Sequence, residues 1–518
     1  MRLKKLLDKR IESGSDNKAF ISGETEISTQ EFLKISNSIC LQLRNRGFKK
    51  FDRLLILAPK SITSIAFIYS CMFDGYIFTP IDTTTPEERL SFIIEDCKPR
   101  GVVVDRANMD RLGESFFNQY PDLVLFPVEI VCDNVFSELD SPNMFLDESS
   151  YIKASDLKDE DGAYIIYTSG STGTPKGVTV CRSALASFIQ SSITKARYTR
   201  DIVFLNFFPL HFDPVLMEII MPWVVGGTTV IFSKFLYIND LVKALQKYKI
   251  TDFSCTPNII SMLVSRISHY HKYDWSMLRS IWFGGESANV NDLKSFVEIT
   301  PNVVLFNGYG PTETIIACSL HEITKNDLDK EILPIGTPMD EVQFTIVNNG
   351  QVVEKDGEVG ELFVSGAQLM DGYWGKPADD INNNFIYLNG KRHYKTDDNV
   401  YKSNGLYYFV GRRSAMIKLR GYRIYPLEIE NAFNSLDEIE NSCVMLDEKN
   451  NLLVGVIELN DMYKDDAEIY EKIVSKLKGK LPGYMIPEKI LYQDRLPRMD
   501  TGKLDIRKIR TMLEVKNG

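Results

Sequence analysis

The most informative stretch of the sequence is Tyr164-Ile-Ile-Tyr-Thr-Ser-Gly-Ser-Thr-Gly-Thr-Pro-Lys-Gly-Val178. Its apolar beginning predicts a buried strand, which opens directly into a run of Gly, Ser, Thr and Pro residues. Glycines let the backbone approach a polyanion closely, the hydroxyls can donate hydrogen bonds, and Lys176 adds positive charge. A flexible linker has a similar composition, but a linker needs neither a preceding strand nor a Pro-Lys-Gly sequence. The stretch therefore predicts a phosphate-binding loop, which differs from a Walker A loop because Pro175 and Gly177 flank the lysine.

Composition and charge narrow the class of protein. The 518 residues are 44% hydrophobic and 25% charged, as in soluble globular proteins, and the formal net charge is −10. A negatively charged chain suits nucleic acid poorly, so no nucleic-acid partner is expected. The eight cysteines have no paired spacing, which favours reduced thiols and a cytoplasmic location. The longest apolar stretch, residues 62–76, is too short and too polar to span a bilayer, and no membrane partner is expected.

The first four fifths of the chain predict an α/β fold. Residues 1–160 and 200–310 alternate short apolar runs with helical patterns, which predicts βαβ units and doubly wound, largely parallel sheets. Residues 120–155 are less regular and are expected to form a loop-rich connection. Residues 330–412 contain shorter runs and an Asn-Asn-Gly turn ending at Gly350, which predicts a small β module.

The last part of the chain predicts a second, smaller domain. Two apolar runs and two helical patterns after residue 412 indicate a compact α+β unit. The predicted domains are therefore residues 1–412 and residues 413–518. One face of the predicted final helix carries Ile469, Ile473, Val474 and Leu477.

Three more segments place polar residues at strand ends or turns. The segment Phe306-Asn-Gly-Tyr-Gly-Pro-Thr-Glu313 follows an apolar run, so Tyr309 could stack on a purine and Glu313 could hold Mg²⁺. The alternative for this segment is a tight turn capped by Asn307. Gly284-Gly-Glu286 ends another predicted strand. Tyr394-Lys-Thr-Asp-Asp398 contains carboxylates, each of which can accept hydrogen bonds from two hydroxyl groups.

Two basic segments lie near the end of the sequence. Residues 411–430 contain Gly-Arg-Arg-Ser and a Lys-Leu-Arg-Gly-Tyr-Arg run, for which the alternative is a solvated basic strand. Leu496-Pro-Arg-Met-Asp-Thr-Gly-Lys-Leu-Asp505 contains Lys503 after a glycine. Without context, a lysine in such a position is usually a solvated helix start.

Taken in order, these segments resemble the adenylate-forming superfamily of adenylation domains, acyl-CoA ligases and luciferases. The resemblance covers about residues 20–510. It implies an enzyme that uses ATP and Mg²⁺, with a mobile small domain that rotates between two half-reactions. The family commonly has Asp at the pivot, where this chain has Ser414. The resemblance also implies that Lys503 and Lys176 are catalytic and that Glu313 holds the metal.

The resemblance assigns nucleotide contacts to the aligned blocks. Asp398 is expected to bind the ribose hydroxyls, although the preceding residue, usually Gly in the family, is Asp397 here. In the lysine segment, Thr501 stands directly before the glycine, where the family usually has Asn. The expected nucleotide-binding residues are Thr168, Ser169, Gly170, Ser171, Thr172, Gly285, Glu286, Asn307, Gly308, Tyr309, Gly310, Thr312, Asp398 and Arg412.

The Phe212-Asp213-Pro214 segment indicates the class of acid substrate. In amino-acid-activating relatives a Phe-Asp pair at this place supplies the carboxylate that binds the α-ammonium group. The alternative is a helix N-cap, since Asp before Pro at a helix start is a good cap. None of the aligned pocket positions is charged, which predicts a neutral substrate side chain. These positions are Pro214, Met217, Asn258, Trp282, Gly284, Gly308, Ile316 and Ala317.

The predicted function is amino-acid adenylation, as in nonribosomal peptide synthesis, followed by transfer to a phosphopantetheine thiol. Little sequence follows Lys503, so a separate carrier protein is the expected partner. One alternative is a D-alanine:carrier-protein ligase, which the run from Ile417 to Arg423 resembles, although those enzymes typically have Cys in place of Gly284. Another is an acyl-CoA or other acid ligase. A third is a nucleotide-binding regulator without catalysis, which the presence of Lys503 and Glu313 disfavours.

Overall fold

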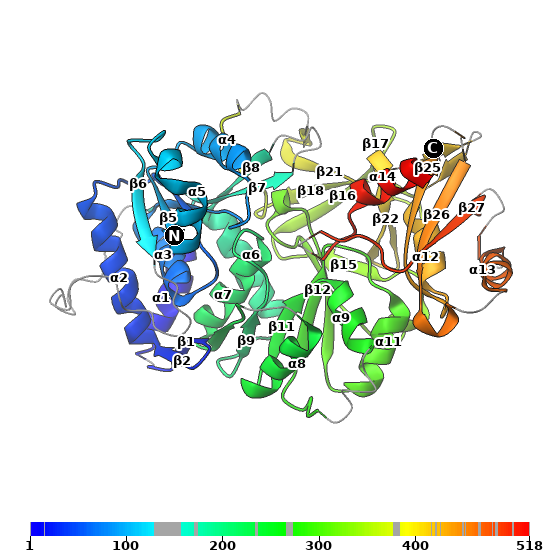
Figure 1. Cartoon of the computed structure of the whole chain (residues 1–518), viewed down its shortest axis with the longest axis horizontal. Coiled ribbons are helices and arrows are strands. Elements are labelled where there is room, and N and C mark those ends of the chain that lie inside the picture. Colours follow the sequence, from blue (N-terminus) through cyan, green and yellow to red (C-terminus); the bar gives the residue numbers. More distant parts are fainter. Residues whose placement is uncertain are drawn as a thin grey trace.

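A computed structural model gives the arrangement of the chain. It describes residues 2–14, 16–128, 157–169, 175–233, 237–265, 273–376, 384–415, 417–419, 422–424, 426–447, 450, 452–464, 468–478, 480–481, 485–499 and 502–516. A large sheet-based domain comes first, and a small C-terminal domain, orange to red in Figure 1, lies at one end of it.

A seven-stranded sheet contains the predicted phosphate-binding segment. Its order is β19-β8-β7-β4-β3-β5-β6, and all pairs from β7 to β6 are parallel. The predicted strand before the loop is β7, and the chain returns antiparallel to it as β8. The strands are β3 (Arg53–Leu57), β4 (Ile77–Pro80), β5 (Gly101–Asp105), β6 (Val124–Val128), β7 (Gly162–Ser169), β8 (Pro175–Cys181) and β19 (Gly372–Tyr373).

The second sheet is longer and mixed. Its order is β17-β16-β18-β21-β22-β15-β14-β13-β12-β11-β9-β10-β1-β2, and β20 pairs with β21. Parallel pairing runs from β1 to β13. Its strands are β1 (Lys18–Ser22), β2 (Thr25–Ser28), β9 (Val203–Asn206), β10 (Thr228–Ile231), β11 (Asp252–Cys255), β12 (Ser280–Gly284), β13 (Val304–Tyr309), β14 (Ser319–Glu322), β15 (Pro334–Pro338), β16 (Val342–Asn348), β17 (Gln351–Val352), β18 (Gly360–Gly366), β20 (Phe385–Leu388), β21 (Lys391–Ser403) and β22 (Leu406–Arg412).

Helices connect the strands of the large domain, as the alternating pattern predicts. Capping residues define several of them: Ser28 and Glu31 form a capping box at the start of α2, and Ser61 caps α3. The helices are α1 (Arg2–Glu12), α2 (Thr29–Asn45), α3 (Ile62–Asp74), α4 (Glu87–Cys97), α5 (Arg106–Phe117), α6 (Arg182–Ala196), α7 (Pro214–Val225), α8 (Ile238–Lys247), α9 (Pro257–Val264) and α11 (Val290–Ile299).

One sequence-based expectation for the large domain needs correction. Part of the predicted loop-rich connection is strand β6, whose alternation is weak because only Phe126 and Val128 are buried in it. The predicted β module forms, including the β16–β17 hairpin at Asn348-Asn-Gly350. Its strand β22 pairs with β15, so the module continues the second sheet.

The small domain packs its own core. Helices α12 (Pro426–Asn434) and α13 (Ile469–Lys478) cover a sheet of β25 (Ile439–Asp447), β26 (Leu452–Leu459) and β27 (Lys489–Gln493). Three of the four residues predicted on one helix face, Ile469, Ile473 and Leu477, are buried, and Val474 is half-buried. That helix is not the final one, because α14 (Ile506–Lys516) follows. The domain also contains η5 (Arg413–Ala415) and the hairpin β23 (Ile417–Leu419) and β24 (Tyr422–Ile424).

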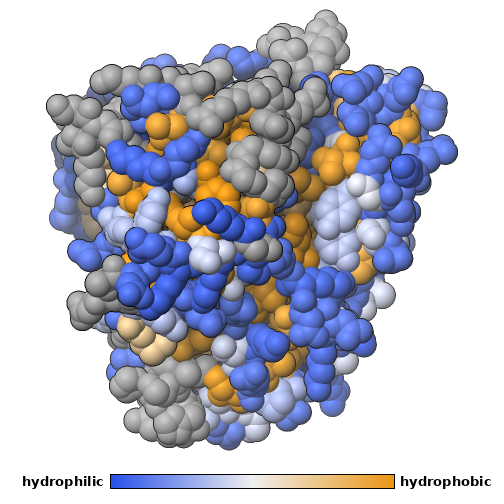
Figure 2. Space-filling view, turned by 90° about the vertical axis from the view of Figure 1, so that its right-hand side faces the viewer, coloured by the Kyte–Doolittle hydropathy of each residue, from blue (hydrophilic) through white to orange (hydrophobic). Residues whose placement is uncertain are grey.

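The outer face of the molecule on the small-domain side is largely hydrophilic, with hydrophobic residues visible between the polar ones (Figure 2). The exposed hydrophobic residues of the small domain include Met462, which is 79% exposed, and Tyr470, which is 42% exposed.

In the described part of the chain no helix is both long and apolar enough to cross a membrane. Seven cysteines there are free and buried, which agrees with the expectation of reduced thiols.

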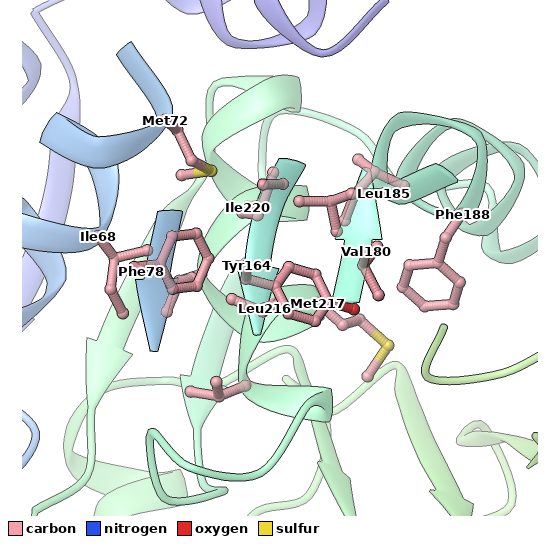
Figure 3. Close-up of a cluster of buried hydrophobic side chains, with 14 of the residues drawn as sticks. Ile68, Met72, Phe78, Tyr164, Val180, Leu185, Phe188, Leu216, Met217 and Ile220 are labelled. Carbon is pink, nitrogen blue, oxygen red and sulfur yellow. The ribbon is translucent and has the colours of Figure 1, made fainter. Parts of the chain in front are cut away.

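A hydrophobic core fixes the strand that leads into the phosphate-binding segment. Tyr164 on β7 and Val180 on β8 are fully buried and pack with side chains of α3, α6 and α7 (Figure 3). Leu216 and Met217 on α7 belong to the same cluster. Because these elements share one core, a shift of β7 would open cavities, and its position is well determined.

Two buried charges join three elements behind this core. The Lys60 ammonium donates to the carbonyl oxygens of Asn206 (2.9 Å) and Phe207 (2.8 Å). The Glu218 carboxylate on α7 accepts from Asn206 Nδ2 (2.6 Å) and Ser254 Oγ (2.5 Å). Burial lowers the pKa of Lys60 and raises the pKa of Glu218, and the attraction between the two groups opposes both shifts. The network ties α7 to the ends of β9 and β11.

We expect Glu218→Ala to destabilise the large domain strongly. The substitution removes the buried acceptor of the hydrogen bonds from Asn206 and Ser254 and the carboxylate that favours the charged form of Lys60, and breaking a buried charged network costs about 3–5 kcal/mol. Calorimetry should show a lower transition temperature for the large domain. The control is Glu322→Ala, since Glu322 forms a surface ion pair with Arg197 and should contribute less than about 1 kcal/mol. Equal losses for the two variants would contradict the prediction.

Candidate active site

The β7–β8 hairpin places Lys176 beside the end of β7. Thr168 pairs with Lys176 and Ser169 pairs with Pro175 across the hairpin. The predicted loop residues Gly170, Ser171 and Thr172 lie outside the described residues. The Lys176 ammonium lies 5.2 Å from the centre of the Tyr373 ring, a cation–π contact that leaves its charge unneutralised.

Close backbone packing at the ends of β12 and β13 leaves no room for side chains at Gly284 and Gly310. Gly284 on β12 pairs with Gly308 on β13, and a Cβ on Gly284 would lie 2.2 Å from the Gly308 carbonyl oxygen. A Cβ on Gly310 would lie 2.7 Å from the Cys318 nitrogen. This packing leads the chain into η2 (Thr312–Thr314), where the Glu313 carboxylate accepts a hydrogen bond from Tyr373 Oη at 2.9 Å.

Two consecutive isoleucines after η2 have left-handed backbone conformations. Ile315 has φ +57° and Ile316 has φ +63°. This region is rarely adopted by β-branched residues, and each such residue costs about 1–3 kcal/mol. Ile315 is completely buried, so surrounding packing holds the strained turn in place. The turn aims the Ile316 N–H at the Asp213 carboxylate.

Asp213 lies at the start of α7 but does not cap it. Its backbone is helical, with φ −56° and ψ −31°, and its side chain makes no capping hydrogen bond. The alternative of a simple helix cap is therefore wrong. Burial raises the pKa of Asp213 to about 6. A hydrogen bond from Thr312 and the positive charge of Lys503 act in the opposite direction and lower this pKa. Its Oδ2 atom is buried and has no hydrogen-bond partner among the described residues.

Asp398 lies on β21 next to Tyr309 and Arg412. Tyr309 Oη donates to Asp398 Oδ2 at 2.6 Å, and Arg412 Nε lies 3.2 Å from Oδ1. Burial raises the pKa of Asp398 to about 6, while Arg412 lowers it. Asp397, at the position where the family usually has Gly, has φ +60°, a glycine-like conformation that Asp tolerates better than most residues.

The Lys503 loop reaches from the small domain to the strand ends of the large domain. Lys503 lies against Gly285: a Cβ on Gly285 would be 3.4 Å from Lys503 Cε and 3.5 Å from Nζ. The loop is closed by hydrogen bonds from Met499 N to Lys503 O (2.8 Å) and from Arg498 Nη1 to Gly502 O (2.8 Å). Gly502 has φ +86° and packs against Thr256 of the large domain. Lys503 and Asp213 thus interact across the two domains.

Other predicted residues have additional or different contacts. Asn307 donates to the Pro334 carbonyl at 2.9 Å, and Asn258 lies 3.7 Å from Met262 Sδ. Glu286 is largely buried, which raises its pKa, while Arg498 and Lys503 lower it. Two predicted pocket residues, Met217 and Trp282, are only 2% and 3% exposed and belong to the hydrophobic core. Pro214 directly follows Asp213, and Ala317 directly follows the strained turn at Ile315 and Ile316.

Sequence reasoning missed Tyr373, Trp374 and Asp96 as neighbours of the site. Tyr373 contacts both Lys176 and Glu313, and Trp374 Nε1 donates to the Asp96 carbonyl at 3.0 Å. Asp96 also accepts from Tyr167 Oη at 2.6 Å. The only signal for them is an aromatic pair after Gly372, which is too common to indicate a site by itself.

The described residues fit a nucleotide and a magnesium ion. Asp398 Oδ1 is buried and, apart from its ion pair with Arg412, makes no hydrogen bond in the described chain, so it can still accept a ribose hydroxyl. Lys176, Lys503 and Arg412 supply positive charge for phosphates. No group of three metal-ligating His, Cys, Asp or Glu residues occurs among the residues described, so Glu313 would act alone. One carboxylate with substrate phosphates is a common way to hold Mg²⁺.

Comparisons with known proteins agree with this geometry. The D-alanine--D-alanyl carrier protein ligase of Bacillus licheniformis is 28% identical over 523 residues, covering 99% of this chain and 100% of the relative. A solved four-domain nonribosomal peptide synthetase bound to AMP and glycine is 25% identical with a TM-score of 0.80, covering 98% of this chain and 36% of that chain. The o-succinylbenzoate coenzyme A synthetase of Bacillus subtilis, in complex with ATP and magnesium ion, shares the fold. It is 22% identical with a TM-score of 0.78, over 98% of this chain and 99% of that chain.

Family models cover both domains. The model of the AMP-binding enzyme matches residues 7–374, and the model of the AMP-binding enzyme C-terminal domain matches residues 428–503. The first match alone spans well over half of the chain, and the two follow in the order of the large and small domains. This protein therefore belongs to the family of AMP-binding enzymes.

Proposed function

We propose that this enzyme uses ATP and Mg²⁺ to activate a neutral α-amino acid as aminoacyl-AMP. It then transfers the aminoacyl group to the phosphopantetheine thiol of a separate carrier protein, in the cytoplasm. Residues 1–412 bind ATP and the amino acid, and residues 413–518 form the mobile domain that carries Lys503. The full-length similarity to a carrier protein ligase supports this proposal.

The buried Asp213 carboxylate is the observation that carries the proposal. A buried carboxylate oxygen without a donor is costly, so its retention indicates a donor that arrives with the substrate. An α-ammonium group supplies both hydrogen-bond donors and the opposite charge. Asp213 interacts with Thr312 and Lys503, so an amino acid bound through its α-ammonium group would have its carboxylate near the proposed nucleotide residues. A fatty or aryl acid would leave Asp213 unsatisfied.

In the first half-reaction, an oxygen of the amino-acid carboxylate attacks the α-phosphorus of ATP. The new P–O bond replaces the bond to the β-phosphate oxygen, and pyrophosphate leaves. Lys503 and Lys176 stabilise the negative charge that develops on the phosphate oxygens. Glu313 would hold Mg²⁺, and the bound ion would neutralise charge on the phosphates. Asp398 and Arg412 hold the ribose, so the reacting groups are aligned before the reaction.

In the second half-reaction, the small domain rotates about Ser414 and removes Lys503 from the site. The phosphopantetheine thiolate, after its proton is lost to solvent, attacks the carbonyl carbon of aminoacyl-AMP. A C–S bond forms, the C–O bond to the phosphate breaks, and AMP leaves. Two described interdomain contacts, the Lys480–Glu331 ion pair and the hydrogen bond from Asn291 to Ser435, lie at the surface and would break at low cost in such a rotation.

The amino-acid side chain is expected to be neutral and small. The proposed pocket wall contains no charged residue, and the large side chains of Met217 and Trp282 limit its depth. D-alanine is therefore an alternative substrate, in line with the name of the Bacillus licheniformis relative. Replacement of Gly284 by Cys, which D-alanine ligases typically have, would require β12 and β13 to separate here.

We expect Asp213→Asn to reduce amino-acid-dependent ATP–pyrophosphate exchange. Loss of the charge removes the partner of the α-ammonium group, and the specificity constant kcat/KM for the amino acid should fall at least about a hundredfold. Exchange should be measured with proteinogenic and D-amino acids, which also identifies the substrate. The matched control is Asp105→Asn, because Asp105 is a buried carboxylate that does cap a helix, α5. Unchanged exchange in Asp213→Asn would favour an acid ligase.

Amino-acid binding should weaken as the pH falls through about 6. The raised pKa of Asp213 means that its carboxylate is ionised above this value and protonated below it. At saturating ATP, kcat/KM for the amino acid should therefore decrease about tenfold per pH unit below pH 6. Activity should return after readjustment to pH 7.5, and circular dichroism at pH 5 should match that at pH 7.5, which together exclude acid unfolding. A constant kcat/KM down to pH 5 would refute the role of Asp213.

Replacement of Lys503 should impair the adenylation step specifically. Lys503→Ala removes a cation at the developing charge, and exchange should slow by about a hundredfold to a thousandfold. Transfer from chemically prepared aminoacyl-AMP to a carrier protein, followed by mass spectrometry, should change little. Lys508→Ala is the control, because Lys508 pairs with Asp505 on the exposed start of α14. Normal exchange in Lys503→Ala would point to a regulator or to another catalytic lysine.

A further inference from the structure

Residues 370–374 form a strap between the two nucleotide segments of the site. Met370 N–H donates to the Glu313 carbonyl at 2.9 Å, and Trp374 N–H donates to the Gly177 carbonyl at 2.7 Å. Between them, β19 pairs antiparallel with β8, with Tyr373 opposite Val178. The strap thus fixes the backbone around Glu313 relative to the backbone around Lys176.

Tyr373 makes side-chain contacts to both charged residues. Its ring lies under the Lys176 ammonium at 5.2 Å, and its hydroxyl donates to Glu313 Oε1 at 2.9 Å. Asn384 Nδ2 donates to the same hydroxyl at 2.9 Å. Because the Asn384 amide occupies the acceptor side of the hydroxyl, the single hydroxyl proton is directed at Glu313. The side chain is therefore oriented from three directions.

The neighbouring Trp374 anchors the strap to the strand before the phosphate-binding loop. Its indole N–H and the Tyr167 hydroxyl both donate to Asp96 of α4. Gly177 packs between them, since a Cβ there would lie 3.1 Å from both Trp374 Cβ and Tyr167 Cζ. The strap has little freedom to move independently of β7 and β8.

We propose that Tyr373 is a positioning residue that holds Lys176 and Glu313 apart and ready for Mg²⁺–ATP. This inference rests on the proposed roles of Lys176 and Glu313. In the described chain these two opposite charges do not form an ion pair with each other. Tyr373 is neutral and engages both, so neither charge is cancelled. By hydrogen-bonding Oε1, it also fixes the direction in which the Glu313 carboxylate would face a metal ion.

The two contacts can be separated experimentally by two substitutions. Tyr373→Phe keeps the ring under Lys176 and removes only the hydrogen bond to Glu313. Tyr373→Leu removes both contacts. Calorimetric titration of ATP into the full-length protein, first in EDTA and then at increasing Mg²⁺, measures each effect without any amino acid and without turnover.

We expect Tyr373→Phe to bind metal-free ATP as the unsubstituted protein does. The Mg²⁺ concentration that gives half of the metal-dependent gain in affinity should rise about tenfold, as is typical when a group that orients a metal ligand is lost. Tyr373→Leu should show the same increase and also bind metal-free ATP several-fold more weakly. The control Tyr387→Phe, at a residue 73% exposed on β20, should change neither quantity.

Several outcomes would overturn the inference. An unchanged Mg²⁺ requirement in Tyr373→Phe would do so, as would identical metal-free ATP binding by Tyr373→Phe and Tyr373→Leu. If thermal unfolding shows that Tyr373→Phe is misfolded, Asn384→Ala replaces it, and a normal Mg²⁺ requirement in that variant counts against the inference. Glu313→Gln distinguishes failure of the Tyr373 inference from failure of the proposed metal role of Glu313. If Glu313→Gln leaves the Mg²⁺ requirement unchanged, the metal role of Glu313 is wrong.

Discussion

The burial of the Asp213 carboxylate is the constraint on which the rest of the site depends. Burial of a charge disfavours its ionised form, and here the opposing influences come from Thr312, the Ile316 N–H and Lys503. The first two belong to the large domain, but Lys503 belongs to the small one. In the proposed function, the arrangement of the domains and the charge state of the substrate site are therefore coupled. In that proposal, an incoming α-ammonium group would donate to Asp213 Oδ2, which has no hydrogen-bond donor among the described residues.

This electrostatic arrangement requires an unfavourable backbone. The consecutive left-handed residues Ile315 and Ile316 are held by the complete burial of Ile315 and by the close packing of Gly310 against Ala317 and Cys318, which follow the turn. Strain that a rigid scaffold maintains is typical of functional sites, because it presents groups that a relaxed chain would turn away. Here it directs a backbone donor at Asp213. The strap at Tyr373 serves a similar purpose for Glu313 and Lys176, with hydrogen bonds and ring contacts in place of strain.

The small domain combines a precisely placed lysine with weak contacts to the large domain. Among the described interdomain contacts, Lys480 pairs with Glu331 at 2.7 Å and Asn291 Nδ2 donates to the Ser435 carbonyl at 3.2 Å. Both are at least partly exposed, and such contacts contribute only a few tenths of a kcal/mol to about 1 kcal/mol each. A domain held in this way can leave and return at low cost. This property suits a reaction in which Lys503 is needed for one step and must make room in the next.

The local sequence determined the strand before the phosphate-binding loop, the glycine turns at the ends of β12 and β13, and the residue types of the site. These follow from periodicity and turn chemistry within short windows, which is why β7, β16 and α13 lie close to their predicted positions. Only the tertiary structure decided that Asp213 does not cap α7, that the β module continues the second sheet, and that Tyr373 stands between Lys176 and Glu313. It also revealed β6 and α14, whose local patterns are weak. The reason is that contacts between residues far apart in the chain depend on how sheets and domains pack, and local hydrophobic periodicity does not record that packing.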